Sequence, residues 1–168
     1  TASVRGVLTA GGTETSGVRE LIVYNNQGTT TINSVIANNG LGNSVALVKS
    51  GGGTLSLAGP NTYTGGTNVS GILQLNNNSA AGTGAISIDN TTASGTNTGF
   101  ATRILINGGV AIGNTVNIGT TTGTAGFGVI QQTGTGLGTV NGAINITGSP
   151  CAGGHFVGGG AVGNELVL

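Results

Sequence analysis

The sequence predicts an all-β fold, a right-handed parallel β-helix (β-solenoid), on the basis of three observations. Short apolar–x–apolar triplets recur along the 168 residues, and the first and third residues of such a triplet share one face of a strand. Glycine, which occupies 36 positions, fills the gaps together with asparagine and threonine, as tight corners require. Only 3% of the residues are aromatic, which indicates a thin core of aliphatic side chains.

The triplets define the expected strands in chain order. Residues 16–24 could pass for one turn of helix, but their β-branched end favours a strand. We expect short strands at residues 22–24, 45–47, 55–57, 73–75, 86–88, 104–106, 116–118, 144–146 and 166–168. Each triplet should bury its two outer members and present its middle residue to the other side. The core should therefore be lined by Leu55, Leu57, Leu73, Leu75, Ile86, Ile88, Ile104, Ile106, Val116 and Ile118.

Two all-β architectures are compatible with short strands. A sandwich or hairpin barrel would have longer alternating strands, a bulkier core and two-residue turns. A parallel β-helix has very short strands, glycine and asparagine corners and thin aliphatic stacks, and the triplets favour it. We treat residues 1–168 as a single solenoid domain, in which corner asparagines are expected to stack in ladders.

Charge is too sparse to support several classes of function. The formal net charge is zero, so no basic patch would hold phosphates, and nucleic-acid binding is not expected. No apolar run approaches the roughly 20 residues of a membrane-spanning helix. The carboxylates of Glu14, Glu20, Asp89 and Glu165 do not form the cluster that acid–base catalysis uses.

Cys151 and His155 form the one other pair of chemically reactive residues. Their C-x3-H spacing could give a thiol–imidazole nucleophile or half of a metal site. Because the chain has no further cysteine or histidine, we expect packed or corner positions instead. The sequence therefore predicts no enzyme, and no catalytic residue, cofactor or metal.

Residues 49–75, KSGGGTLSLAGPNTYTGGTNVSGILQL, carry the most specific pattern in the chain. A lysine and a glycine-rich corner precede the triplet 55–57, and an Asn-Thr-Tyr-Thr-Gly-Gly-Thr run follows it. This pattern resembles the autotransporter-associated β-strand repeat, also called the passenger-associated transport repeat. The matching positions are Lys49, Gly51, Gly53, Thr54, Leu55, Leu57, Gly59, Asn61, Thr62, Tyr63, Thr64, Gly65, Gly66, Thr67, Val69, Gly71, Leu73 and Leu75.

The resemblance implies an extracellular or bacterial cell-surface location and a right-handed parallel β-helix. Such repeats build stalks, adhesins and giant surface proteins, and they are not themselves catalytic. Tyr63 is expected to cover a corner with its hydroxyl hydrogen-bonded.

We expect the chain to perform this structural role by associating with itself, end to end, into a surface filament. Solenoid ends expose unpaired strand edges, and a head-to-tail contact that does not close produces a filament. The possible assembly strand consists of Asn164, Glu165, Leu166, Val167 and Leu168. The alternatives are the stalk of a large surface protein, an adhesin that binds surface glycans, and a threonine-rich ice-binding solenoid built on residues 29–31 and 120–122.

Overall fold

A computed structural model describes residues 5–88, 102–120, 129–148, 156–159 and 164–168. All regular elements of these residues are β-strands, and every strand pairing is parallel. The parallel β-helix is thereby confirmed, because a sandwich or hairpin barrel is built from antiparallel pairs. Within the described residues, no helix has the length and apolarity that a membrane crossing requires.

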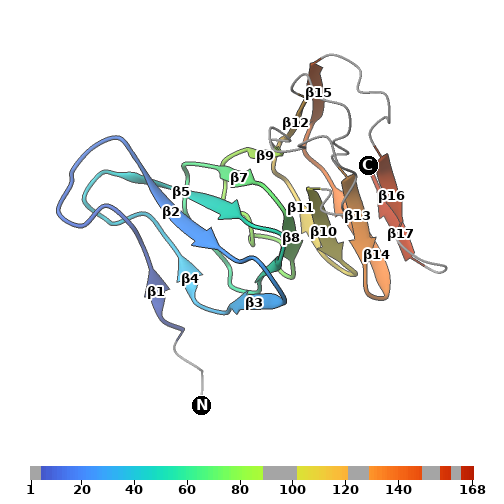
Figure 1. Ribbon diagram of the computed structural model, residues 1–168, viewed down its shortest axis with the longest axis horizontal. Coiled ribbons are helices and arrows are strands. Elements are labelled where there is room, and N and C mark those ends of the chain that lie inside the picture. Colours follow the sequence, from blue (N-terminus) through green and yellow to red (C-terminus); the bar gives the residue numbers. More distant parts are fainter. Residues whose placement is uncertain (1–4, 89–101, 121–128, 149–155, 160–163) are drawn as a thin grey trace.

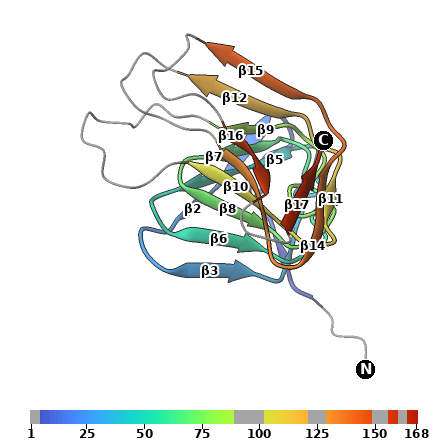
Figure 2. The same ribbon diagram turned by 90° about the vertical axis from the view of Figure 1, so that its right-hand side faces the viewer.

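Successive turns of the chain stack along the long axis of the molecule and form three faces (Figures 1 and 2). Face 1 is a six-stranded sheet that contains β2 (Val18–Tyr24), β5 (Ser44–Ser50), β7 (Thr67–Val69), β9 (Ile86–Ile88), β12 (Val116–Thr120) and β15 (Ile144–Gly148). Face 2 is a second six-stranded sheet that contains β3 (Thr29–Ile32), β6 (Thr54–Leu57), β8 (Ile72–Leu75), β10 (Arg103–Asn107), β13 (Val129–Thr133) and β16 (Phe156–Gly159).

Face 3 is shorter and less regular. It contains β1 (Val7–Leu8) paired with β4 (Val35–Ile36), and a separate sheet of β11 (Ala111–Ile112), β14 (Gly136–Val140) and β17 (Asn164–Val167). Irregular backbone fills the interval between these two sheets. There the Thr62 N–H donates to the Ile36 carbonyl at 2.8 Å, and the Thr83 N–H donates to the Tyr63 carbonyl at 3.1 Å. Hydrogen bonding along face 3 therefore continues through the turns that lack a strand.

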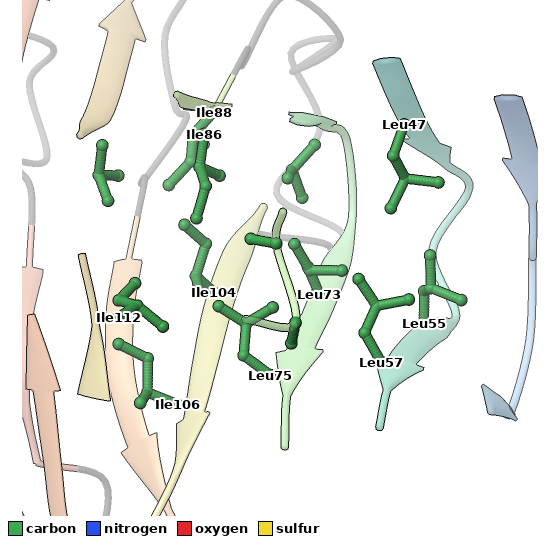
Figure 3. Close-up of a cluster of buried hydrophobic side chains, with 14 of the residues drawn as sticks. Leu47, Leu55, Leu57, Leu73, Leu75, Ile86, Ile88, Ile104, Ile106 and Ile112 are labelled. Carbon is green, nitrogen blue, oxygen red and sulfur yellow. The ribbon is translucent and has the colours of Figure 1, made fainter. Parts of the chain in front are cut away.

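The interior is filled by straight rows of side chains, because strands in register place equivalent residues above one another. In face 1, one inward row runs Leu21, Leu47, Thr67, Ile86, Val116, Ile144. In face 2, one inward row runs Ile32, Leu57, Leu75, Ile106, Gln132. The branched side chains of these rows meet in the centre of the coil (Figure 3). All ten residues expected to line the core are buried there, and none is more than 1% exposed.

The expected orientation of the triplets is wrong at the first strand. Ile22 and Tyr24 point outward, with 63% and 69% of their surface exposed, whereas Val23 between them packs against the core. The pairing register is the reason: Val23 lies beside the inward Lys49, and this parity turns both neighbours to the outside. The triplet alone did not specify which of its faces is the inner one.

The expected burial of outer triplet members also fails at the far end of the coil. Ile146 lies beside the buried Ile118 on a second inward row of face 1 and is nevertheless 56% exposed, since β15 is the last strand of its sheet in the described residues. Leu166 of β17 packs against the core, but Leu168, which follows the end of that strand, is 71% exposed. Inward direction gives full burial only where a further turn covers the residue.

The connections from face 1 to face 2 differ in length along the coil. The early turns use short corners, residues 25–28, 51–53 and 70–71. In later turns, the connection from β9 to β10 spans residues 89–102, and the one from β12 to β13 spans residues 121–128. The connections from face 1 to face 2 are therefore longer in later turns, while the strands that flank them keep their parallel register.

Candidate functional site

The segment 49–75 occupies the middle of the coil, from the end of β5 through β8. Polar side chains inside a solenoid are costly unless they are hydrogen-bonded. Three of the repeat's polar residues are nevertheless almost fully buried: Lys49, Asn61 and Thr67. Each of them is engaged by the backbone or by another side chain, and these contacts show what the motif does.

Lys49 is an inward residue of β5 and is completely buried. It lies between Val23 of the turn before and Val69 of the turn after. Its Nζ donates to the carbonyls of Ser50 at 2.9 Å and Gly51 at 2.6 Å, at the corner that leads into β6. In the described part of the chain, no backbone N–H bonds to the Gly51 carbonyl, so the ammonium supplies its donor. Burial lowers the pKa of Lys49 below that of an ordinary lysine.

Asn61 connects three successive turns through one side chain. Its Oδ1 accepts the Ile36 N–H at 2.7 Å, and its Nδ2 donates to the Ala80 carbonyl at 2.6 Å. Its own N–H donates to the Ser79 carbonyl at 3.1 Å. The side-chain amide thus takes the place of a backbone amide in face 3, where no regular strand is present in this turn.

Tyr63 lies in the irregular segment between β6 and β7 and is fully buried. The hydroxyl is bonded as expected, since it lies 2.6 Å from the Thr67 hydroxyl. Burial raises the pKa of the Tyr63 phenol well above its ordinary value, although the hydrogen bond to Thr67 acts in the opposite direction. The ring is part of the buried hydrophobic core and lies against Gly82 of the next turn, where an added Cβ would stand 3.1 Å from it.

The glycines of the motif permit a close approach between neighbouring corners. Gly71 has a φ of +111°, and a Cβ at this position would overlap the Gly51 carbonyl of the preceding turn. A Cβ at Gly65 would stand 2.6 Å from the Val45 carbonyl. The spacing between turns is set by backbone pairing at about 4.8 Å, and the corners reach it only without a side chain.

Other corners use amide side chains in the same way, and no sequence motif marks these positions. The Gln132 amide donates to the carbonyls of Thr133 and Gly134, and the Asn114 amide donates to those of Gly82 and Gly84. Asn114 therefore bonds to backbone carbonyls and does not form the expected side-chain ladder, whereas Asn76 after β8 donates to the Ser56 hydroxyl of the preceding turn at 2.7 Å. A ladder pair occurs on the outer side of face 1 instead, where Asn145 donates to Asn117 at 2.9 Å.

The candidate chemical residues are dispersed in the described part of the chain. Glu14 forms a 2.9 Å ion pair with Arg19, and Glu20 lies on the outer side of β2. No group of three or more histidines, cysteines, aspartates and glutamates among the described residues could hold a metal ion. Asp89, Cys151 and His155 lie outside the described residues.

On the described part of face 2 the threonine run of β3 continues for at most one further turn, because Thr29 lies beside Thr54 and Thr54 lies beside Ile72. Thr31 in β3 is followed in register by Ser56 and then by Gln74. Because an ice-binding surface repeats threonine on successive turns, this register gives the ice-binding hypothesis no support. Residues 121–122 of the second run lie outside the described residues.

The possible assembly strand is part of the coil itself. Residues 164–167 form β17, which pairs with β14 in parallel register. β17 is the terminal strand of its sheet in the described residues, so its second edge has no paired strand. Leu166 uses its side chain to pack against the core.

Two comparisons with known proteins agree with this structure. A family model described as passenger-associated-transport-repeat matches residues 47–75, which confirms the resemblance drawn from residues 49–75. Over 98 residues, or 58% of this chain, the sequence is 37% identical to the "Adhesin BmaC autotransporter" of Brucella suis biovar 1 (strain 1330). The matched stretch covers 3% of that relative's length. No solved structure matches the chain significantly.

Proposed function

We propose that this chain is a non-enzymatic rod segment of a bacterial surface protein of the autotransporter passenger type. The observation that carries the proposal is the use of the motif's polar residues. Lys49, Asn61 and Tyr63 direct their polar atoms to neighbouring backbone or side chains inside the coil. Lys49 and Tyr63 fasten the corners of their own turn, and Asn61 connects its turn to the turns on either side, which supports a mechanical role. The similarity to an autotransporter adhesin supports a location outside the cell.

Stacking of further turns on both ends of the coil is the finer part of the proposal. β2 and β3 end their sheets on one side, and β15, β16 and β17 end theirs on the other. Unpaired N–H and C=O groups on such edges accept another parallel strand. These edges can be covered by neighbouring turns of a longer chain, which makes a stalk, or by a second copy of this chain, which makes a filament.

The isolated 168-residue chain distinguishes these two forms. Negative-stain electron microscopy and sedimentation velocity should show rods that lengthen with protein concentration if copies stack end to end. Ile146→Lys places a charge on the uncovered inward row of β15 and should abolish the lengthening. Leu137→Lys is the matched control, because Leu137 is similarly exposed, at 51% against 56%, but lies on the outer side of β14.

The outcomes separate clearly. Concentration-dependent rods that Ile146→Lys shortens and Leu137→Lys leaves unchanged support the filament. A folded monomer at all concentrations contradicts the filament and leaves the stalk. An unfolded or molten chain would contradict the rod proposal itself.

A second candidate function, recognition of surface glycans or other surfaces, is favoured by exposed apolar side chains on the outer side of β2, where Glu20 lies between Val18 and Ile22. Val18, Ile22 and Tyr24 are 57%, 63% and 69% exposed and share the outer side of the strand. Aromatic and aliphatic side chains of this kind mark contact surfaces more often than isolated apolar residues do. A glycan array probed with the wild-type chain and with Tyr24→Ser tests it, with Leu137→Ser as control. Binding that depends on Tyr24 would support an adhesin, and absence of any bound glycan would count against glycan recognition.

A further inference from the structure

Three Asn–Gly steps occur in the described residues, and their surroundings differ. They are Asn39–Gly40, Asn107–Gly108 and Asn141–Gly142. An Asn–Gly step can cyclise when the glycine nitrogen reaches the asparagine side-chain carbonyl carbon, because glycine has no side chain to hinder the approach. The local hydrogen bonds then decide which step reacts.

Asn39 has the arrangement that promotes this reaction. Its Oδ1 accepts the Leu41 N–H at 2.9 Å, so a donor already faces the oxygen on which negative charge would develop. In the described part of the chain, no backbone hydrogen bond uses the Gly40 N–H. Gly40 is exposed, and a Cβ built on it would meet nothing within 4 Å. The attacking nitrogen is therefore free to move.

The two loops that meet at Asn39 also leave buried polar atoms without hydrogen-bond partners. Residues 9–17 and 37–43 lead into β2 and β5 and contact one another through the Asn39 Nδ2, which donates to the Glu14 carbonyl at 3.1 Å. Beside this contact, the Asn43 Nδ2 and Oδ1 and the Arg19 Nε are buried without a hydrogen-bond partner. Buried unpaired polar groups regain water when the loops separate, which lowers the cost of local opening.

From these observations we propose that Asn39 is a site of spontaneous deamidation. The Gly40 nitrogen gives up its proton to a solvent base and bonds to Asn39 Cγ, with the developing oxyanion held by the Leu41 N–H. The Cγ–Nδ2 bond then breaks, and the nitrogen leaves as ammonia with a proton from solvent. Water opens the resulting succinimide at either carbonyl, which gives aspartate or isoaspartate. Solvent water is the one co-reactant.

The other two steps are held in unreactive surroundings. The Gly108 N–H donates to the Thr133 carbonyl at 2.8 Å and to the Asn107 Oδ1 at 3.1 Å, and both bonds must break before the nitrogen can attack the Asn107 Cγ. Gly142 packs so tightly that a Cβ there would overlap the Asn114 carbonyl, and in the described residues no hydrogen bond engages the Asn141 side chain. These two positions serve as internal controls with the same dipeptide.

Deamidation at Asn39 would weaken the contact between the two loops. The amide that donates to the Glu14 carbonyl is replaced by a carboxylate, which cannot donate and repels that oxygen. The isoaspartate product also lengthens the main chain by one atom at a turn where Gly40 has a φ of +77°. The reaction would act as a slow chemical timer that loosens one end of the coil.

Peptide mapping by mass spectrometry of the folded chain at 37 °C and mildly alkaline pH measures the three rates side by side. Asn39 should lose its amide about tenfold faster than Asn107 or Asn141, which corresponds to a barrier difference of about 1.4 kcal/mol. In concentrated urea the three rates should converge, since the hydrogen bonds that distinguish them are lost. In an Asn39→Gln variant the reaction would require a six-membered ring, which forms much more slowly. Loss of the deamidation signal in this variant therefore assigns the signal to residue 39.

Equal rates at the three steps in the folded chain, or faster loss at Asn107 or Asn141, would overturn the proposal. The proposal would also be overturned if Asn39 stayed intact in the folded chain over the time in which Asn39 of the urea-unfolded chain deamidates. As a second readout, Asn39→Asp should be cleaved faster than wild type by a protease within residues 9–17 and 37–43, whereas Asn141→Asp should not. Unchanged cleavage of Asn39→Asp would contradict the predicted loosening of the loops.

Discussion

Lys49 and Gln132 occupy corresponding positions at two different corners of the coil. Each is the last inward residue of its strand, and each donates to the carbonyls of the two residues that follow it. Lys49 does so where face 1 meets face 2, and Gln132 where face 2 meets face 3. A buried donor at the end of an inward row is thus a recurrent device for turning the chain.

This correspondence predicts that Lys49→Gln is tolerated and Lys49→Met is not. Glutamine keeps a donor near the corner carbonyls, whereas methionine fills the row but leaves the Gly51 carbonyl without one. We expect Lys49→Met to lose about 1–3 kcal/mol of unfolding free energy, the cost of an unsatisfied buried polar group. Urea unfolding followed by circular dichroism measures both variants. Equal losses for the two would show that the ammonium charge, and not its hydrogen bonds, matters.

Alkaline pH should change stability in two opposite ways. Lys49 has a lowered pKa in the folded chain, so above that pKa the unfolded chain binds more protons, and stability rises until the ordinary lysine value is passed. Tyr63 has a raised pKa, so above about pH 10 the unfolded chain releases a proton that the folded chain retains, and stability falls. Tyr63→Phe should remove the fall, and Lys49→Gln should remove the rise. Unfolding free energies measured from pH 8 to 11 test both, and identical profiles for wild type and variants would contradict them.

Asn61→Ala should be among the most destabilising polar substitutions. It leaves the Ile36 N–H and the Ala80 carbonyl buried without a partner, which we expect to cost about 2–5 kcal/mol for the two groups together. Asn145→Ala is the control, since it removes an exposed pair with Asn117 and should change stability by less than about 0.5 kcal/mol. Thermal unfolding of both variants gives the comparison. A small effect at Asn61 would mean that face 3 does not depend on its amide.

The sequence was sufficient to predict the fold and most of the core because both depend on local pattern. Leu55 and Leu57 alternate with polar residues and are separated from the next strand by glycine, so their burial could be inferred without knowing the pairing. The outward direction of Ile22 and Tyr24 could not, since it depends on which residue of β5 lies beside Val23. An apolar triplet therefore predicts a strand, but the pairing register determines which side of that strand faces the core.

The buried hydrogen bonds of Lys49 and Asn61 could not be predicted from the sequence for a different reason. Lys49 stands at the inward position that follows Val45 and Leu47 with a period of two, and this parity could have indicated a buried lysine. Asn61 carries no such signal, because its partners Ile36 and Ala80 come from other turns of the chain. Long-range pairs of this kind require the stacking order, which a single repeat copy does not contain.

Leu73→Ala should cost about 2–5 kcal/mol, the range for removing a large side chain from a packed core. Leu73 is fully buried and lies between Leu55 and Ile104 in face 2, so the turns on either side hold the space open. Leu137→Ala is the control at a half-exposed position and should lose much less. Urea unfolding curves for the two variants provide the measurement, and similar midpoints would indicate a core that collapses around the missing side chain.

Gly71→Ala tests whether the corners limit how closely the turns stack. The added Cβ would overlap the Gly51 carbonyl. In addition, the φ of +111° at residue 71 is unfavourable for any residue with a side chain. We expect the loss to exceed about 4 kcal/mol, which only a severe local conflict produces. Gly28→Ala separates the two causes, since Gly28 also has a positive φ, +67°, but a Cβ there meets nothing within 4 Å. Its loss should stay near the roughly 1–2 kcal/mol of a left-handed backbone, and a comparable loss at both glycines would show that dihedral strain, rather than contact between turns, sets the requirement.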